Sequence, residues 1–181
     1  MIATPTSLPE VLILEPKVFP DARGFFFESY NAADLRRFGV DYEFVQDNHS
    51  RSSRNVLRGL HYQIQQPQGK LVRVVSGTIL DVAVDLRRNS PNFGKWEGVY
   101  LSEENKRMLW IPPGFGHGFL VISESVDFLY KTTDYYAPEH ERTIPWNDPE
   151  LAIEWPLNGP PTVSAKDQQG VRFREAEVFE S

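Results

Sequence analysis

The stretch Gly77 to Arg87, GTILDVAVDLR, alternates between two sets of side chains, as a β-strand does. One set is wholly apolar, and the other includes two carboxylates. Because an ionised carboxylate is not buried without a partner, the second face lines either a polar cavity or the solvent side of a sheet. The residues leave both open, and Asp81, near the strand centre, is the carboxylate to expect in a cavity. Leu80, Val82, Val84 and Leu86 form the apolar face, and Ile79, Asp81, Ala83 and Asp85 form the other.

Similar short runs of β-branched and aromatic residues recur along the chain, separated by glycine, proline, asparagine or serine. This pattern is typical of an all-β sandwich or barrel. The number of runs suits a double-sheet jelly roll with one or two short helices. The runs predict strands over residues 11–14, 24–30, 56–63, 71–75, 78–86, 96–101, 108–111, 118–123 and 126–132.

The remaining segments complete this picture. Residues 31–39, NAADLRRFG, predict a short helix with Asn31 as its N-cap and Gly39 as its end. Ser76 and Gly77 lie between two strand-like runs and predict a hairpin turn. From Ala137 onward the chain is rich in proline, which indicates an irregular C-terminal tail lying over the sheets. We therefore expect a single domain over residues 1–181.

The composition limits the possible functions. Among 181 residues there is no cysteine, so disulfides are excluded and a zinc site would need histidines and carboxylates. The formal net charge of −6 argues against binding a nucleic-acid backbone, although a local basic pocket can still hold a small anion. The N-terminal residues lack the features of a signal sequence or a membrane span. We expect a cytoplasmic protein with no nucleic-acid or membrane partner.

The stretch Val56 to Gln63, VLRGLHYQ, places an arginine, a glycine and a histidine within four residues. In a regular strand Arg58 and His61 point to opposite faces. Glycine within a strand often marks a bulge, and a bulge at Gly59 would let both polar groups reach one cavity. Taken alone, however, a histidine such as His61 is more often a hydrogen-bonded structural residue.

Residues 112–119, PPGFGHGF, show the Pro-x-Gly-x-x-His spacing of the second metal-ligand motif of cupins, ending at His117. The first motif of metal-binding cupins supplies a His-x-His pair and a downstream glutamate. The comparable place here reads His61, Tyr62 and Gln63. One histidine from each motif falls short of the three or so protein ligands that such sites need. We therefore expect no metal.

Four further residues suit particular chemistry, although each alone is more often a surface or packing residue. Arg23 stands beside a glycine and suits a phosphate, because the guanidinium fork binds two oxygens. Lys70, at the entrance to a strand, suits an enolate oxygen. Tyr130 offers a phenol within an apolar strand, and Tyr136 offers an aromatic face beyond it.

Taken together, these stretches resemble the dTDP-4-dehydrorhamnose 3,5-epimerase family, RmlC-type sugar-nucleotide epimerases with a cupin jelly roll. The resemblance extends over nearly the whole chain. It implies inversion of C3 and C5 of dTDP-4-dehydro-6-deoxy-D-glucose to give dTDP-4-dehydro-L-rhamnose, in dTDP-L-rhamnose biosynthesis, by a cofactor-free homodimer. It rests on FPDARGFFFESY, FVQDNHSRS, VLRGLHYQ, QGKLVRVVSGTILDVAVDLR, SPNFGKW, LSEENKRMLWIPPGFGHGF, YKTTDYY, IPWNDPELAIEWP and AKD, in the family's order.

The resemblance also implies roles for individual residues. His61 matches the general base, Tyr130 the general acid, and Asp167 the carboxylate that pairs with the base. Tyr136 matches the aromatic residue that stacks on thymine in the family. The substrate-binding residues that the resemblance implies are Arg23, Glu28, Gln46, Asp47, Asn48, Arg58, Lys70, His117, Tyr136, Glu141 and Lys166.

Three other functions remain open at this point. A close relative that inverts only C3 or only C5, or that moves the ketone, would share most of the pocket. A metal-dependent cupin oxygenase or isomerase would need the ligands that the first motif lacks. A sugar-binding module without chemistry would not need His61, Tyr130 and Asp167 together.

Overall fold

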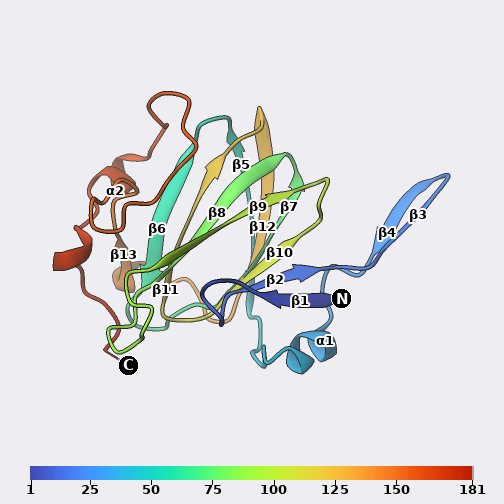
Figure 1. Ribbon diagram of the computed structural model, residues 1–181, viewed down its shortest axis with the longest axis horizontal. Coiled ribbons are helices and arrows are strands. Elements are labelled where there is room, and N and C mark those ends of the chain that lie inside the picture. Colours follow the sequence, from blue (N-terminus) through green and yellow to red (C-terminus); the bar gives the residue numbers. More distant parts are fainter. Residues whose placement is uncertain (181) are drawn as a thin grey trace.

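The computed structural model describes residues 1–180, which form two facing antiparallel β-sheets and a projecting hairpin (Figure 1). This arrangement confirms the all-β, double-sheet jelly roll. The six-stranded sheet runs in the order β1 (Ile2–Pro5), β2 (Leu12–Glu15), β10 (Met108–Ile111), β7 (Lys70–Ser76), β12 (Ser125–Thr132) and β5 (Gln46–Ser53). The five-stranded sheet runs in the order β13 (Glu141–Thr143), β6 (Leu57–Gln63), β11 (Phe115–Val121), β8 (Thr78–Asp85) and β9 (Trp96–Ser102).

The remaining elements are short. The projecting hairpin consists of β3 (Val18–Asp21) and β4 (Gly24–Phe27). The helices are α1 (Ala32–Arg37) and α2 (Ala165–Gln168), with single 3₁₀ turns at Pro138–His140 and Phe173–Glu175. None of the helices within residues 1–180 has the length and apolar content needed to cross a membrane.

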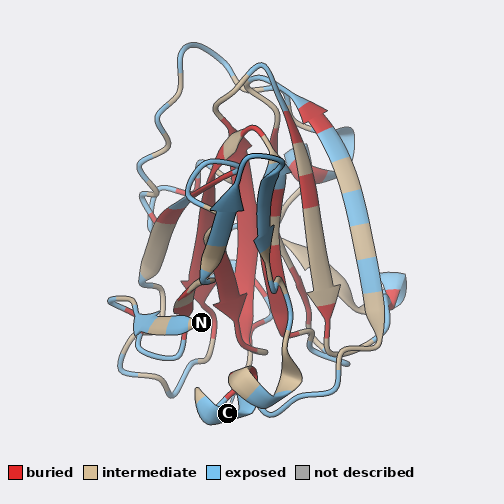
Figure 2. Ribbon diagram, turned by 90° about the vertical axis from the view of Figure 1, so that its right-hand side faces the viewer, coloured by how far each residue is buried: buried red, intermediate tan, exposed pale blue. Residues whose placement is uncertain are grey.

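Both faces of β8 are buried, and this decides whether the face that carries Asp81 points to solvent or to the interior. Ile79 and Ala83 belong to the core between the sheets, and Asp81 on the same face is 0% exposed. A solvent-facing carboxylate side is therefore wrong for this strand. The opposite face packs under the C-terminal tail, where Val82 shares a second core with Val178. Figure 2 shows the buried residues concentrated in the central strands. The tail thus covers the outer face of the five-stranded sheet, as its composition predicted.

The outer face of the six-stranded sheet is covered in part by α1. Asn31 caps this helix, because its side-chain oxygen accepts hydrogen bonds from the N–H groups of Ala33 and Asp34. Leu35 is then buried against Leu71 and neighbouring residues of the sheet. The predicted helix and its N-cap are confirmed.

The predicted hairpin at Ser76 and Gly77 is wrong. The strands on either side, β7 and β8, belong to different sheets, so these residues form a corner between the two layers. Gly77 has φ +86°, and a Cβ placed there would lie 2.1 Å from the backbone oxygen of Ser125. The glycine is needed because the chain changes sheets in close contact with the start of β12.

Four strands were not predicted from the sequence: β1, β3, β5 and β13. The most important is β5, whose sequence, QDNHSRSS, contains no apolar residue. It lies at the edge of the six-stranded sheet and pairs along its whole length with β12. Pairing with an apolar neighbour, rather than its own propensity, makes this segment a strand.

The hairpin of β3 and β4 extends away from the sheets (Figure 1). Three of its phenylalanines are largely exposed: Phe19 by 50%, Phe25 by 60% and Phe26 by 68%. So many exposed aromatic rings on one short element mark a surface that favours a partner.

We expect Gly77→Ala to destabilise the protein more than Gly39→Ala, as measured by urea unfolding. Both glycines have nearly the same φ, +86° and +85°, so both variants carry the left-handed penalty of about 1–2 kcal/mol. A Cβ at Gly39 meets nothing within 4 Å, whereas one at Gly77 collides with backbone. The collision adds roughly 1–3 kcal/mol. Equal losses for the two variants would contradict the tight corner.

Candidate active site

A cavity of about 320 Å³ lies between the sheets and is lined by polar side chains from both of them. A second hollow, of about 410 Å³, opens beside it and shares Arg58 and His61 with it. Lys166 and Asp167 bring α2 to this second hollow. Volumes of this size suit a small organic ligand. The polar residues of the first cavity include Asn48, Arg58, His61, Lys70, His117 and Tyr130.

Arg58 and His61 reach the same cavity because β6 pairs irregularly with β11. His61 lies opposite His117, and Arg58 lies opposite Phe119. Three residues along β6 therefore correspond to only two along β11. At this point Gly59 has φ +111°, and a Cβ there would lie 2.6 Å from the Cα of Gly118. The expected bulge at Gly59 is therefore confirmed, and glycine is required on both strands.

His61 is held by a carboxylate from α2. Its Nε2 lies 2.5 Å from Oδ1 of Asp167, whose Oδ2 accepts a hydrogen bond from Gly59 N–H at 3.2 Å. Burial raises the pKa of the Asp167 carboxyl. The hydrogen bond with His61, the charge of His61, and the hydrogen bonds from Gly59 and Ser164 together lower the pKa by more than burial raises it, so the net shift is downward. A charged Asp167 keeps the proton on Nε2, which leaves Nδ1 with a free lone pair.

Lys70 and His117 are buried basic groups from opposite sheets. Burial lowers the pKa of Lys70 to about 8, against the attraction of Asp81 and Glu141. His117 Nε2 lies 2.8 Å from Oδ1 of Asp81. Burial lowers the pKa of His117 more than this contact raises it, and it raises the pKa of Asp81. We infer that His117 is a neutral, oriented imidazole at neutral pH.

Tyr130 faces the cavity from β12, in the sheet opposite to His61. Burial raises the pKa of its phenol, and the nearby charge of Arg58 only partly opposes this. Tyr130 therefore keeps its proton at neutral pH. The guanidinium of Arg58 is oriented by Ser52, whose hydroxyl oxygen accepts from Nε at 3.1 Å and from Nη2 at 3.0 Å.

A second cluster of polar side chains surrounds Tyr136. The Tyr136 hydroxyl donates to Oε2 of Glu141 at 2.6 Å, and the ammonium of Lys166 pairs with the same oxygen. Burial raises the pKa of Glu141, but the hydrogen bonds from Lys166 and Tyr136, together with nearby positive charge, lower it overall. Gln46 accepts from the N–H of Tyr136 at 3.0 Å and donates to Asn48 at 3.0 Å.

Three of the predicted substrate contacts lie away from the cavity. Arg23 and Glu28 belong to the projecting hairpin and the segment after it, and Arg23 pairs there with Asp21. Asp47 faces the outer side of the six-stranded sheet, where its carboxylate pairs with Lys131 at 2.9 Å.

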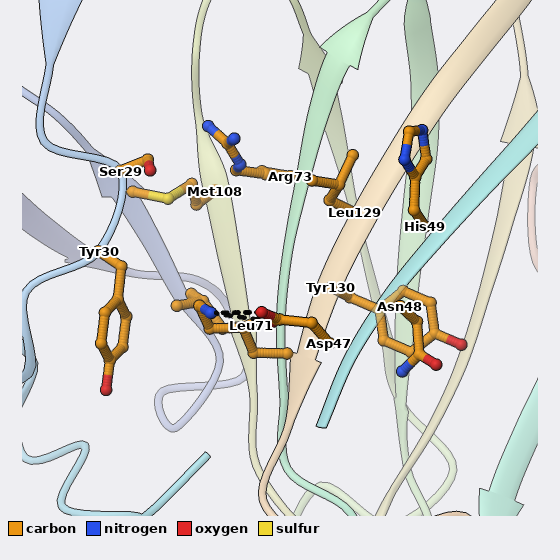
Figure 3. Close-up of a pocket in the computed structure, with 11 residues that line it drawn as sticks. Ser29, Tyr30, Asp47, Asn48, His49, Leu71, Arg73, Met108, Leu129 and Tyr130 are labelled. Atoms are coloured by element: carbon orange, nitrogen blue, oxygen red, sulfur yellow. Dashed lines mark hydrogen bonds and ion pairs between the residues drawn. The ribbon is translucent and has the colours of Figure 1, made fainter. Parts of the chain in front are cut away.

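That outer side holds a separate pocket of about 350 Å³ (Figure 3). Figure 3 shows Arg73 extending toward Ser29 and Met108, and the Asp47 contact beside Leu71. Asn48, His49 and Tyr130 line both this pocket and the cavity between the sheets.

Two supporting residues were not predicted: Ser52 orients Arg58, and Ser164 caps the helix that carries Asp167. Asp81, which the sequence predicted for a cavity, is buried behind His117 and does not line the cavity itself. Ser164 did carry a signal, because Ser-x-x-Asp is a helix-capping pattern. Ser52 lies on the polar strand β5 and carried none.

The two histidines of the cupin-like motifs face each other across β6 and β11 but form separate pairs. His61 binds Asp167, and His117 binds Asp81. Within residues 1–180, no group of three or more histidine, aspartate or glutamate side chains is arranged to hold a metal ion.

The sequence model for dTDP-4-dehydrorhamnose 3,5-epimerase matches residues 5–175. The chain belongs to the dTDP-4-dehydrorhamnose 3,5-epimerase family. It is 62% identical over 180 residues to the dTDP-4-dehydrorhamnose 3,5-epimerase of Pseudomonas aeruginosa, with 99% of each chain covered. Membership of this epimerase family makes the protein an isomerase.

Solved structures agree with this assignment. The epimerase RmlC of Legionella pneumophila, in complex with dTDP-4-keto-L-rhamnose, superposes with a TM-score of 0.97 at 50% identity, covering 99% of this chain and 98% of that one. A 3′-monoepimerase from Streptomyces bikiniensis, in complex with dTDP-quinovose, gives 0.88 at 33% identity, covering 94% and 87%. The expected cupin-like jelly roll is confirmed.

We expect turnover by this epimerase family member to fall as the pH rises through about 8, where Lys70 loses its proton. Lys70 carries a positive charge only while its side chain is protonated. Tyr130 does not explain a loss near pH 8, because its own pKa is raised above its ordinary value. The measurement is the pH profile of kcat/KM, which reports the protonation of the free enzyme.

The matched variant is Lys70→Arg, whose guanidinium stays charged throughout this range. In that variant any remaining activity should no longer decline near pH 8. If the decline near pH 8 persists unchanged in Lys70→Arg, a group other than Lys70 causes the decline.

Proposed function

We propose that this chain inverts C3 and C5 of dTDP-4-dehydro-6-deoxy-D-glucose, giving dTDP-4-dehydro-L-rhamnose, and that His61 and Tyr130 are its two proton carriers. One observation carries the proposal. The two side chains enter one cavity from opposite sheets, His61 from β6 and Tyr130 from β12. Inversion of a carbon needs a proton removed from one side and returned on the other, and carriers on opposite walls meet that need.

The substrate's ketone at C4 acidifies the hydrogens on both C3 and C5. A single site that stabilises one enolate oxygen can therefore serve both carbons. The ketone itself accepts the electron pair, so the reaction needs no cofactor. His61 is suited to remove each proton, because Asp167 holds its Nε2 proton and leaves Nδ1 free.

Lys70 is suited to stabilise the enolate. Its ammonium is buried in the cavity wall, and a fixed positive charge in a site of low polarity stabilises a developing oxyanion more than water does. Its lowered pKa also allows it to share a proton with the enolate oxygen. Tyr130 keeps its proton and can deliver it to the carbon from the opposite sheet.

The remaining residues suit the nucleotide. Arg58 lines both hollows and is oriented by Ser52, which suits a diphosphate next to the sugar. Tyr136 presents an aromatic ring that is 52% exposed and suits a thymine base. We assign substrate binding to these two residues together with Gln46, Asn48, Lys70, His117, Glu141 and Lys166.

A second function, inversion of only one carbon, is favoured by one observation. The 3′-monoepimerase shares the fold over most of both chains. Fold therefore does not separate one inversion from two. Isotope incorporation at each carbon separates them.

The experiment that tests the proposed function is turnover of the 4-keto-6-deoxyglucose nucleotide in deuterium oxide. The unmodified chain should incorporate deuterium at both C3 and C5. His61→Asn should lose exchange at both carbons by about 10²–10⁴-fold, because one base serves both. Exchange retained at either carbon would show that another base acts there. Incorporation at one carbon only in the unmodified chain would establish a monoepimerase.

Tyr130→Phe should separate exchange from inversion. The variant removes the phenolic proton and keeps the ring that packs against Phe128. His61 and Lys70 remain, so deuterium should still enter the substrate, while inverted product falls sharply, most at C5. Product analysis by NMR measures both. If inversion proceeds normally, another group is the acid, and if both processes disappear, Tyr130 is needed for enolisation or binding.

We also propose that the protein is a homodimer in which the projecting hairpin reaches the partner's site. The hairpin carries Arg23 away from the cavity of its own chain and exposes Phe19, Phe25 and Phe26. Packing of the hairpin on a second copy would cover the exposed aromatic rings and would bring Arg23, which suits a phosphate, to the partner's site.

Mixing two impaired variants tests this arrangement. Arg23→Ala keeps the base, and His61→Asn keeps the hairpin. If Arg23 acts across the dimer, subunit exchange should restore activity to about a quarter of the unmodified level, because half of the dimers then contain one complete site. No gain in activity, despite mixed dimers detected by mass spectrometry, would place Arg23 outside the partner's site.

A further inference from the structure

The backbone around Tyr136 is held by the side-chain amides of two glutamines. Gln63 donates from Nε2 to the carbonyl oxygen of Tyr135 at 3.2 Å, and its Oε1 accepts from the N–H of Ala137 at 2.9 Å. Gln46 accepts from the N–H of Tyr136 at 3.0 Å. Both polar groups of the peptide between Tyr135 and Tyr136, and the N–H of the next peptide, therefore have side-chain partners.

Gln63 is the central member of this arrangement. It is 4% exposed and lies at the end of β6, two residues after His61. Its Nε2 also donates to the carbonyl oxygen of Gln66 at 2.8 Å, so both of its amide hydrogens are used. A buried amide with all its donors paired fixes the groups around it, because breaking any one bond leaves a buried polar group unsatisfied.

The segment just before Tyr136 is held in the same way. The carbonyl oxygen of Asp134 accepts from Nε2 of Gln68 and from the hydroxyl of Thr132, each at 2.9 Å. The loop of residues 134–137 is thus fixed along its backbone, although the Tyr136 ring itself is half exposed. The hydroxyl of this ring is held as well, by Glu141 at 2.6 Å.

We propose that Gln63 is a positioning residue for nucleotide binding, because its side-chain amide fixes the loop that presents Tyr136 to the base. This inference rests on the proposed function, in which the Tyr136 ring contacts the nucleobase. Gln63 occupies the place where metal-binding cupins have the second histidine of His-x-His. Here that position is bonded to the loop, and it serves the nucleotide end of the site rather than the reacting carbons.

The physical advantage of this arrangement is preorganisation. An aromatic side chain on a mobile loop loses conformational freedom when a ligand stacks on it, and that loss weakens binding. A loop already fixed by buried amides loses less. Removing the bonds of Gln63 should therefore weaken binding of the nucleotide and leave proton transfer at His61 nearly unchanged.

The test uses Gln63→Met, which keeps the length of the side chain and removes its hydrogen bonds. We expect dTDP to bind about 10-fold more weakly by isothermal titration calorimetry, equivalent to about 1.4 kcal/mol. KM for the keto sugar nucleotide should rise similarly, while kcat stays within about twofold. The matched control is Gln65→Met, because Gln65 is exposed and its side chain makes no hydrogen bond within residues 1–180.

A double-mutant cycle separates positioning from general stability. In a Tyr136→Ala background, Gln63→Met should no longer weaken dTDP binding, because the ring that it positions is absent. Unchanged dTDP affinity in Gln63→Met, or an equal loss with and without Tyr136, would overturn the inference. If Gln63→Met does not fold, Gln68→Met removes one bond to the same loop and should show a smaller loss with the same dependence on Tyr136.

These outcomes are distinct from failure of the proposed function. If the unmodified chain binds dTDP but does not turn over the keto sugar nucleotide, the epimerase proposal fails and the cycle still decides the role of Gln63. If the unmodified chain does not bind dTDP at all, both proposals are overturned.

Discussion

The close contact of β6 with β11 at Gly59 and Gly118 is the constraint on which the site depends. A Cβ on Gly59 would lie 2.6 Å from the Gly118 Cα, and one on Gly118 would lie 2.7 Å from the backbone oxygen of Arg58. Because neither strand carries a side chain there, the strands can approach while the register shifts. The shift turns Arg58 and His61 into one cavity and directs the Gly59 N–H to Asp167. A single backbone irregularity therefore places His61, orients its partner Asp167 and positions Arg58.

A jelly-roll interior is apolar, so each polar group that lines it needs a partner. His61 has Asp167, His117 has Asp81, and Arg58 has Ser52. Lys70 differs, because within residues 1–180 its ammonium forms no ion pair while burial lowers its pKa. A buried cation without a dedicated anion is poised to interact with negative charge that the reaction creates. The cavity therefore holds a buried positive charge before any ligand enters.

The sequence allowed much of the fold to be predicted, because apolar alternation, the Asn31 cap and the tail composition are local signals. The corner at Gly77 was predicted wrongly, since a glycine with positive φ suits both a hairpin and a change of sheet. The strand β5 was missed because its residues are polar and its conformation comes from pairing with β12. In the site, the bulge at Gly59 was predictable, whereas Ser52 and Gln63 act through contacts that only the folded chain creates. The hairpin position of Arg23 likewise depends on tertiary structure.

The C-terminal tail connects the fold to the chemistry. Asp167 lies 106 residues from His61 along the chain, so His61 has no carboxylate partner until the tail docks. The tail docks because Ile144 and Val178 pack on the apolar side of β8, where Val82 is fully buried. Ser164 then caps α2 and directs Asp167 toward β6. The proline-rich composition reduces the conformational freedom lost when this long segment is ordered. Packing on the outer face of one sheet therefore holds in place the carboxylate that orients His61 on the inner face.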